Sequence, residues 1–231
     1  MAEQPPIKRE HVVEFGKAGT PPAEADGRLD APAFHRTHAP IWSVLSRLLE
    51  GRSGDVLEIG SGTGQHVVRF AAQSPAITWW PSDYLESHVR SIDAWRKYEP
   101  RDNVRAPVQL DASASDWNLA ERGLPSTFIA MLCVNVIHIA PWRVAEGIFA
   151  GAGRHLSADG RLFLYGAFRR DGAHNSPSNE TFDENLRRDN PEWGVRDTAD
   201  LKKLAEANAL RLAELAPMPS NNAMLIFGRI K

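Results

Sequence analysis

From Ile41 onward, segments with a helical spacing of apolar residues alternate with short apolar runs typical of strands. The expected helices are 41–50, 65–73, 84–98, 142–156 and 198–209, and the expected strands are 55–59, 76–80, 104–110, 128–137, 161–168, 210–215 and 223–230. Strand alternating with helix predicts right-handed crossovers and a parallel sheet that helices cover on both faces. The pattern therefore predicts an α/β fold.

The last two expected strands depart from this alternation. The connection between them, which contains PMPSNN (217–222), is too short for a helical crossover. We therefore expect these two strands to pair antiparallel. The nearly continuous apolar run Phe128–Val134 is typical of a central strand that is buried on both faces.

Two segments lack a periodic apolar pattern. The beginning of the chain is rich in proline, and we expect residues 1–33 to form a flexible arm or lid and 34–231 to form a single domain. Residues 169–195 form a polar insertion after the fifth strand, at the edge where open α/β sheets place their ligand crevice. We expect the arm and the insertion to fold together over a ligand.

Composition narrows the classes of partner. The 231 residues include 27 Lys and Arg against 29 Asp and Glu, so the net charge of −2 provides no field to attract nucleic acid or an anionic membrane. Cys133 is the only cysteine and leaves no cysteine-based metal site. The sequence contains neither a signal peptide nor an apolar stretch of about 18 residues, so we expect a cytoplasmic protein that binds no membrane. We also expect a monomer or homodimer that binds a small molecule but no metal and no nucleic acid.

The strongest motif is the glycine-rich stretch VLEIGSGTGQH at 56–66, which follows a buried strand and opens a helix. Glycines at such a turn let a ligand approach the backbone, and the helix offers unpaired N–H groups. A dinucleotide-binding fingerprint would place its third small residue where Gln65 stands, and a phosphate-binding Walker loop would need Gly-Lys-Ser/Thr. The motif thus predicts a nucleotide-like cofactor of another kind.

With Glu58 two residues before the first glycine, the motif resembles the first motif of the class I S-adenosylmethionine (SAM) methyltransferases. This resemblance implies a Rossmann-like methyltransferase fold, with a mostly parallel seven-stranded sheet and an antiparallel last strand. It also implies SAM as cofactor and S-adenosylhomocysteine (SAH) as product. The cofactor-binding residues that it implies are Glu58, Gly60, Ser61, Gly62, Gly64, Asp83, Tyr84, Asp111, Ala112 and Asn135.

The resemblance gives some of these residues particular roles. Asp83 would accept from both ribose hydroxyls, Asp111 and Ala112 would address the adenine edge, and Asn135 would lie beside the methyl group. The residues alone leave alternatives open, because Asp83 could cap the next helix and Asp111 could be an ordinary acid at a strand end. Glu58 lies in an apolar strand, so we expect loop amides or the cofactor's amino group to pair with it.

A closer resemblance extends over about residues 30–231. Motifs shared with the methyltransferase-like 26 group are HAPI (38–41), NVIHI (135–139), YGAF (165–168), SN (178–179), FDENL (182–186), WGVRD (193–197) and MPSNN (218–222). That group contains SAM-methyltransferase-like proteins of largely undefined substrate. It commonly carries Arg-Asn before the acidic residue, proline and isoleucine of its first helix, whereas this chain has Arg36-Thr37-His38-Ala39 before Pro40-Ile41.

Methyl transfer mainly requires a nucleophile held in line and water excluded, so a general base is optional. If one acts, His138 is the best candidate, because it follows the fourth strand and histidine titrates near neutrality; the alternative is a histidine that caps the following turn. The substrate-binding candidates are His38, His174, Asn179, Glu180, Asn221 and Asn222. The adjacent asparagines 221–222 also fit an ordinary turn.

Three functions are compatible with these features. The leading hypothesis is a SAM-dependent methyltransferase that acts on an oxygen, nitrogen or sulfur atom of a small molecule. The alternative is a regulatory or interaction protein that binds SAM and catalyses no reaction. A nicotinamide-dependent oxidoreductase is disfavoured by the glycine spacing and by the absence of a Tyr-x-x-x-Lys motif.

Overall fold

The computed structural model describes residue 21 and residues 23–230. A seven-stranded sheet forms its centre, in the order β3-β2-β1-β4-β5-β10-β9. The strands are β1 (Gly54–Ile59), β2 (Ile77–Asp83), β3 (Val108–Gln109), β4 (Phe128–Val134), β5 (Leu156–Gly166), β9 (Leu210–Met218) and β10 (Asn222–Arg229). Neighbouring strands are parallel except at β10, which is antiparallel to both β5 and β9. The predicted Rossmann-like fold with an antiparallel last strand is confirmed.

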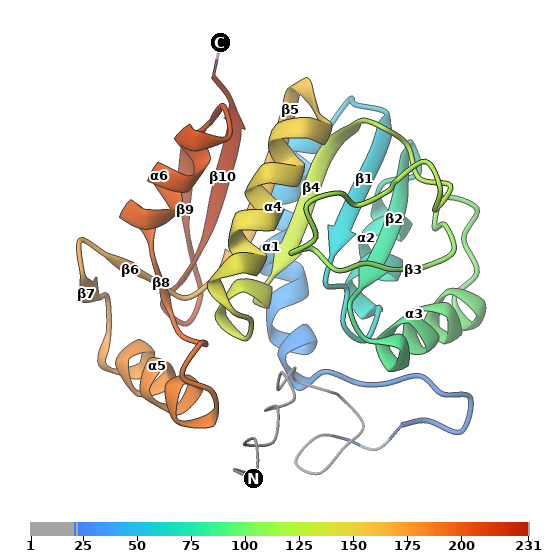
Figure 1. Cartoon of the computed structure of the whole chain (residues 1–231). Coiled ribbons are helices and arrows are strands. Elements are labelled where there is room, and N and C mark those ends of the chain that lie inside the picture. The colour runs from blue at the N-terminus through green and yellow to red at the C-terminus, as the bar shows by residue number, and fades with distance from the viewer. Residues whose placement is uncertain (1–20, 22, 231) are drawn as a thin grey trace, which may run out of the picture.

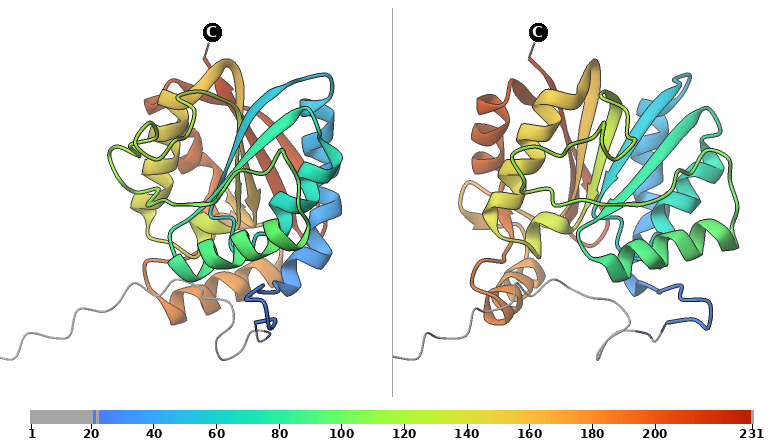
Figure 2. Two further views of the ribbon diagram at one scale, coloured as in Figure 1. Left: turned by 90° about the vertical axis from the view of Figure 1, so that its right-hand side faces the viewer. Right: turned by 45° about the vertical axis from the view of Figure 1, so that its right-hand side comes forward.

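Helices cover both faces of this sheet (Figures 1 and 2). They are α1 (Pro32–Leu49), α2 (Gln65–Gln73), α3 (Glu86–Tyr98), α4 (Trp142–His155) and α6 (Thr198–Ala207). Alternate strand residues point to opposite faces, so Leu57 and Met131 pack in the core beneath α4 and α6. Val56 and Leu132 pack in the second core, beneath α1 and α2. Burial on both faces explains the continuous apolar runs of the central strands.

Several elements have other bounds than the sequence predicted, and proline explains the differences in helix α1 and strand β3. Helix α1 begins at Pro32 rather than at Ile41 and continues through Pro40. A proline is compatible with the first turn of a helix, which explains the early start. Strand β3 is only two residues long, and Val104 makes just an isolated bridge to Trp79. Pro107 lies between these two contacts and has no N–H group for a strand hydrogen bond.

The polar insertion 169–195 is more ordered than the sequence analysis suggested. It contains α5 (Pro177–Asp189), and β6 (Phe168–Arg170), β7 (Ala173–His174) and β8 (Arg196–Asp197) form a small sheet in the order β7-β6-β8. The Ser176 hydroxyl caps α5 by accepting from the Asn179 N–H. Because the buried face of α5 carries the polar Asn179 and Asp183, the helix has no apolar stripe that its sequence could reveal.

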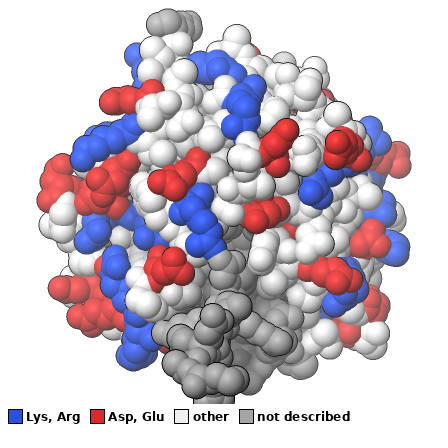
Figure 3. Space-filling view, viewed as in Figure 1, with Lys and Arg blue, Asp and Glu red and all other residues white. Residues whose placement is uncertain are grey.

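The surface carries charges of both signs. On the face shown in Figure 3, lysine and arginine side chains are interspersed with aspartate and glutamate, and neither sign forms a continuous patch. Among the described helices, none combines the length and the apolar character needed to cross a membrane.

Candidate functional site

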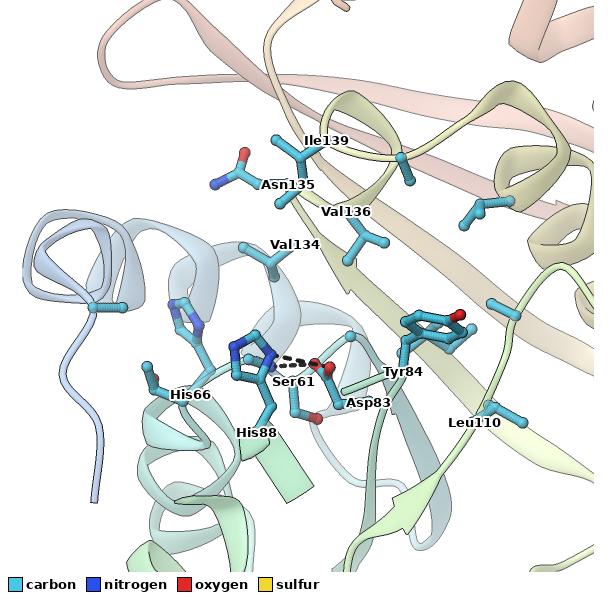
Figure 4. Close-up of a pocket in the computed structure, with 18 of the residues that line it drawn as sticks. Ser61, His66, Asp83, Tyr84, His88, Leu110, Val134, Asn135, Val136 and Ile139 are labelled. Carbon is cyan, nitrogen blue, oxygen red and sulfur yellow. Dashed lines mark hydrogen bonds and ion pairs between the residues drawn. The ribbon is translucent and has the colours of Figure 1, made fainter. Parts of the chain in front are cut away.

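A pocket opens at the carboxyl edge of the sheet, where β1, β2 and β4 end (Figure 4). Its mainly apolar wall is built from the first turns of α1, the glycine loop after β1, the end of β2, the segment after β3, and the chain from the end of β4 into α4. The predicted cofactor residues that line it are Gly60, Ser61, Gly62, Asp83, Tyr84, Asp111, Ala112 and Asn135. The fold thus brings together residues that are spread over the first two thirds of the chain.

The glycine loop requires glycine for both its conformation and its neighbours. Gly60, Gly62 and Gly64 have φ angles of 69°, 59° and 93°, which disfavour residues with a side chain. A Cβ atom on Gly64 would lie 2.7 Å from the Ile92 Cα, and one on Gly60 would collide with Val136. The loop therefore presents bare backbone to the pocket, while Gly64 permits close packing of α2 against α3 and does not itself line the wall.

Asp83 joins three segments of the site. Its Oδ2 accepts from the Gly62 N–H at 2.8 Å, and its Oδ1 accepts from the Leu85 N–H and from the His88 Nδ1, both at 3.0 Å. The residue is 5% exposed. The carboxylate thus fixes the glycine loop relative to the start of α3. The N-cap of α3 is Leu85, so Asp83 does not cap that helix.

Glu58 is buried under the loop without lining the pocket. Burial, reinforced by the nearby charge of Asp83, raises its pKa to about 8, although a hydrogen bond from Ser61 opposes this shift. Its Oε2 has no hydrogen-bond partner in the described part of the chain, so the loop amides expected there do not pair with this atom. With such a pKa, Glu58 is mainly protonated near neutral pH.

Asp111 and Asn135 line the pocket from the segments that follow β3 and β4. Asp111 is exposed, and its Oδ1 accepts from the N–H and the hydroxyl of Ser113 at 2.8 and 2.7 Å. Asn135 has a φ angle of 59°, and its N–H donates to the Tyr165 carbonyl. This left-handed residue ends β4 and turns the chain into the short 3-10 helix η1 (Val136–His138), whereas the sequence had suggested a strand as far as residue 137.

Gln65, which interrupts the dinucleotide fingerprint, has a defined structural role. Its Oε1 accepts from the Ala31 N–H and the Thr63 hydroxyl, both at 2.8 Å, and its Nε2 donates to the Asp30 Oδ1 at 2.7 Å. It therefore holds residues 28–31, which we call the strap, against the glycine loop. The strap leads into α1, whose Phe34 and Thr37 line the pocket.

His138, the predicted general base, does not line the pocket. Its side chain is fully buried, and its ring lies edge-on against Phe168 with 5.2 Å between centroids. Burial, followed by the charge of Arg196, lowers its pKa to about 4, and neither ring nitrogen has a hydrogen-bond partner among the described residues. Its carbonyl accepts from the Gly194 N–H, as a residue that stabilises the turn would do. The geometry thus gives no support to a role as base.

The substrate-binding candidates also lie outside the pocket wall. His174 pairs with Asp183 at 3.3 Å, and the Asn179 amide donates to Asn175 and to the Asn221 carbonyl. The remaining candidates also lie elsewhere: Glu180 is exposed on α5, Asn222 donates to the Tyr165 hydroxyl, and His38 stacks on Phe34. Their assignment to substrate binding stays a prediction.

Sequence reasoning missed two histidines in the wall, His66 and His88. The His66 Nε2 lies 3.2 Å from the Thr37 hydroxyl, and burial lowers its pKa to about 3. His88 contacts Asp83 as described above. Each had a signal in the sequence: His66 directly follows the glycine motif, and His88 stands five residues after the strand-end acid. Among the described residues, no group of three or more His, Cys, Asp or Glu residues could hold a metal ion.

The fold resembles that of solved methyltransferase structures. A methyltransferase of calicheamicin biosynthesis, in its SAH-bound form, has a TM-score of 0.64 and 18% identity, with 85% of this chain and 55% of that chain covered. An O-methyltransferase family protein from Burkholderia thailandensis has a TM-score of 0.69 and 14% identity, with 85% of this chain and 57% of that chain covered. The mitomycin 7-O-methyltransferase has a TM-score of 0.65 and 15% identity, with 85% of this chain and 56% of that chain covered.

This chain therefore spans slightly more than half the length of those proteins. At such low identity the likeness establishes the shared fold, while function depends on the residues of the site. A family model described as "Protein of unknown function (DUF938)" matches residues 28–229. Its first matched residue, Arg28, is also the first residue of the strap.

Proposed function

This chain belongs to the DUF938 family, and we propose that it is a SAM-dependent methyltransferase that acts on a small-molecule acceptor. The observation that carries the proposal is the position of Asp83. Its carboxylate lies in the pocket wall at the end of β2, bound to the backbone of the glycine loop that follows β1. A carboxylate in this place can accept from a ribose hydroxyl, and the bare loop can admit a nucleoside-linked chain.

The shape of the site fits the parts of SAM. Tyr84, Leu110 and Ala112 would border the adenine, Asp83 would bind the ribose, and the loop Gly60–Gly62 would border the methionine part. The glycine conformations support this fit, because they leave bare backbone in the pocket wall at Gly60 and Gly62. In the same arrangement Asn135 would lie beside the reacting methyl group.

The bound cofactor would supply an electrophilic methyl group on a sulfonium. The chain's own residues would then hold the acceptor in line and exclude water, which the apolar wall made by Val134, Ile139 and the first turns of α1 favours. A small acceptor is supported by the shared fold of a methyltransferase of calicheamicin biosynthesis and of the mitomycin 7-O-methyltransferase. A cytoplasmic location, a monomeric or homodimeric state and membership of the methyltransferase-like 26 group stay predictions from the sequence.

The burial of His138 favours a second candidate function, a SAM-binding protein that catalyses no reaction. A methyltransferase that needs no general base is also compatible with a buried His138. The two candidate functions therefore differ only in whether a methyl group is transferred. A screen of small acceptors with methyl-labelled SAM separates them, because label transfer to any acceptor requires catalysis. Binding of SAM with no transfer across phenols, amines and thiols would favour the non-catalytic function.

Calorimetric titration with SAM, SAH and NAD tests cofactor choice. We expect SAM and SAH to bind and NAD not to bind. Asp83→Asn should weaken SAH binding by about 2 kcal/mol, because the charge-assisted hydrogen bond to ribose is lost. Asp159→Asn is the matched control, since Asp159 is an exposed aspartate paired with Arg52 and lies outside the pocket wall. Binding of NAD alone, or unchanged SAH affinity in Asp83→Asn, would contradict the proposal.

A further inference from the structure

Asp83 has fewer free acceptor positions than the ribose role predicted from sequence requires. A carboxylate offers about four lone-pair positions, two on each oxygen. Oδ1 already accepts from the Leu85 N–H and from His88, both at 3.0 Å. Oδ2 accepts from the Gly62 N–H at 2.8 Å. Among the contacts made by the described residues, one position is left, and it is on Oδ2.

The three existing contacts belong to the architecture of the site. The N–H groups of Leu85 and Gly62 are backbone donors next to a buried carboxylate, and leaving either unpaired would cost free energy. The His88 side chain is 4% exposed and that of Asp83 is 7% exposed, so water does not readily replace their contact. Figure 4 shows the ring of His88 beside Asp83 within the pocket wall. A ligand would therefore meet an acid whose Oδ1 is already fully used.

Building on the proposed function, we infer that Asp83 binds only one of the two ribose hydroxyls and that His88 occupies the acceptor position that the second hydroxyl would need. His88 is then a positioning residue: it turns the carboxylate so that Oδ2 alone faces the ligand. This differs from the two-hydroxyl arrangement that the sequence resemblance implied. It makes the two hydroxyls unequal in their contribution to affinity.

The inference is tested on the native protein with three ligands, SAH and its 2′-deoxy and 3′-deoxy analogues, by calorimetry. One deoxy analogue should bind between about 10-fold and 100-fold more weakly than SAH, because a hydrogen bond to a charged group is lost. The other should bind within about threefold of SAH. Similar large losses for both analogues would show that Asp83 binds both hydroxyls and would overturn the inference.

The remaining outcomes separate this inference from the proposed function. No loss for either analogue would overturn the inference together with the ribose role of Asp83, while leaving SAH as a ligand. Failure of SAH itself to bind would instead overturn the proposed function. The native protein suffices for all of these outcomes, so none depends on whether a variant folds.

Two variants assign the asymmetry to His88. His88→Leu removes the donor and frees a position on Oδ1, so the second hydroxyl gains a partner and the difference between the two analogues should shrink to less than about fivefold. His88→Asn is the conservative control, because its amide can still donate to Oδ1 and should keep the difference. A purely structural role for His88 would lower affinity for all three ligands alike, and that result in His88→Leu would contradict the positioning role.

Discussion

At the scale of single residues, two acids at neighbouring strand ends are in opposite surroundings. Asp83 accepts three N–H hydrogen bonds, whereas Glu58 Oε2 accepts none in the described part of the chain and its pKa is raised to about 8. The motif presents both simply as acids. The hydrogen bonds of Asp83 depend on donors that the folded chain supplies, and the raised pKa of Glu58 depends on its burial, so both are tertiary properties.

His138 makes stability depend on pH. Its pKa in the folded protein is about 4, below the ordinary value of 6.5, so the unfolded chain takes up its proton first as the pH falls. This histidine therefore stabilises the fold above pH 6.5, and its contribution is lost as the pH falls toward 4. Glu58 has a raised pKa, so its contribution to stability changes with pH in the opposite direction. Because the native protein and a His138 variant both contain Glu58, its effect cancels when their stabilities are compared.

We expect His138→Phe to gain about 2 kcal/mol in unfolding free energy relative to the native protein when the pH is lowered from 7.5 to 5. Urea unfolding at both pH values measures this difference. His35→Gln serves as the control for loss of an exposed histidine. The His35 side chain is 60% exposed and pairs with Asp30, and the loss of such an exposed pair should change the unfolding free energy by less than about 1 kcal/mol at either pH. A difference that does not change with pH would contradict the assignment of acid sensitivity to His138.

At the scale of elements, the first helix is part of the pocket because the strap holds it there. The strap is bonded to α2 through Gln65 and to α3 through Ser91, which accepts from the Leu29 N–H at 2.9 Å. Leu29 is buried, and its carbonyl accepts from the Trp95 ring N–H. Leu29 and Ala31 therefore contact α2 and α3, and truncation before residue 34 would remove these contacts.

Replacing Gln65 with alanine tests this coupling. The change leaves the Ala31 N–H and the Thr63 hydroxyl without their acceptor, so we expect a loss of about 1 to 3 kcal/mol in unfolding free energy. SAH should also bind more weakly, since α1 forms part of the wall. Gln73→Ala provides a matched control at the exposed end of the same helix. Equal stability and SAH affinity in both variants would exclude a role for the strap.

At the scale of the whole molecule, the insertion is attached to the domain on the side of the last hairpin. Figures 1 and 2 show α5 beyond the carboxyl edge of the sheet. Asn179 on α5 donates to the Asn221 carbonyl at 2.9 Å, and Asp183 accepts from the Val195 N–H. None of the residues 169–195 lines the pocket. A lid formed with the N-terminal arm stays a prediction, because residues 1–20 and 22 lie outside the described residues.

This attachment predicts that the insertion can loosen without loss of cofactor binding. Asn179→Ala removes two hydrogen bonds, so limited proteolysis should cut residues 169–195 faster, while SAH affinity stays within about twofold. Glu184→Ala, an exposed change on the same helix, should be cut at the native rate. A parallel loss of SAH affinity in Asn179→Ala would show that the insertion supports the pocket.

The α/β fold, the antiparallel last strand and the glycine loop could be predicted from the sequence, because each depends on local patterns: apolar periodicity, connection length and conformations that only glycine adopts readily. It could not place His66 and His88 in the pocket wall or His138 outside it. Nor could it reveal α5, whose buried positions are polar. These points became visible in the folded chain, because burial, hydrogen-bond partners and pKa depend on segments that meet in space, such as Gly62 and Leu85 around Asp83.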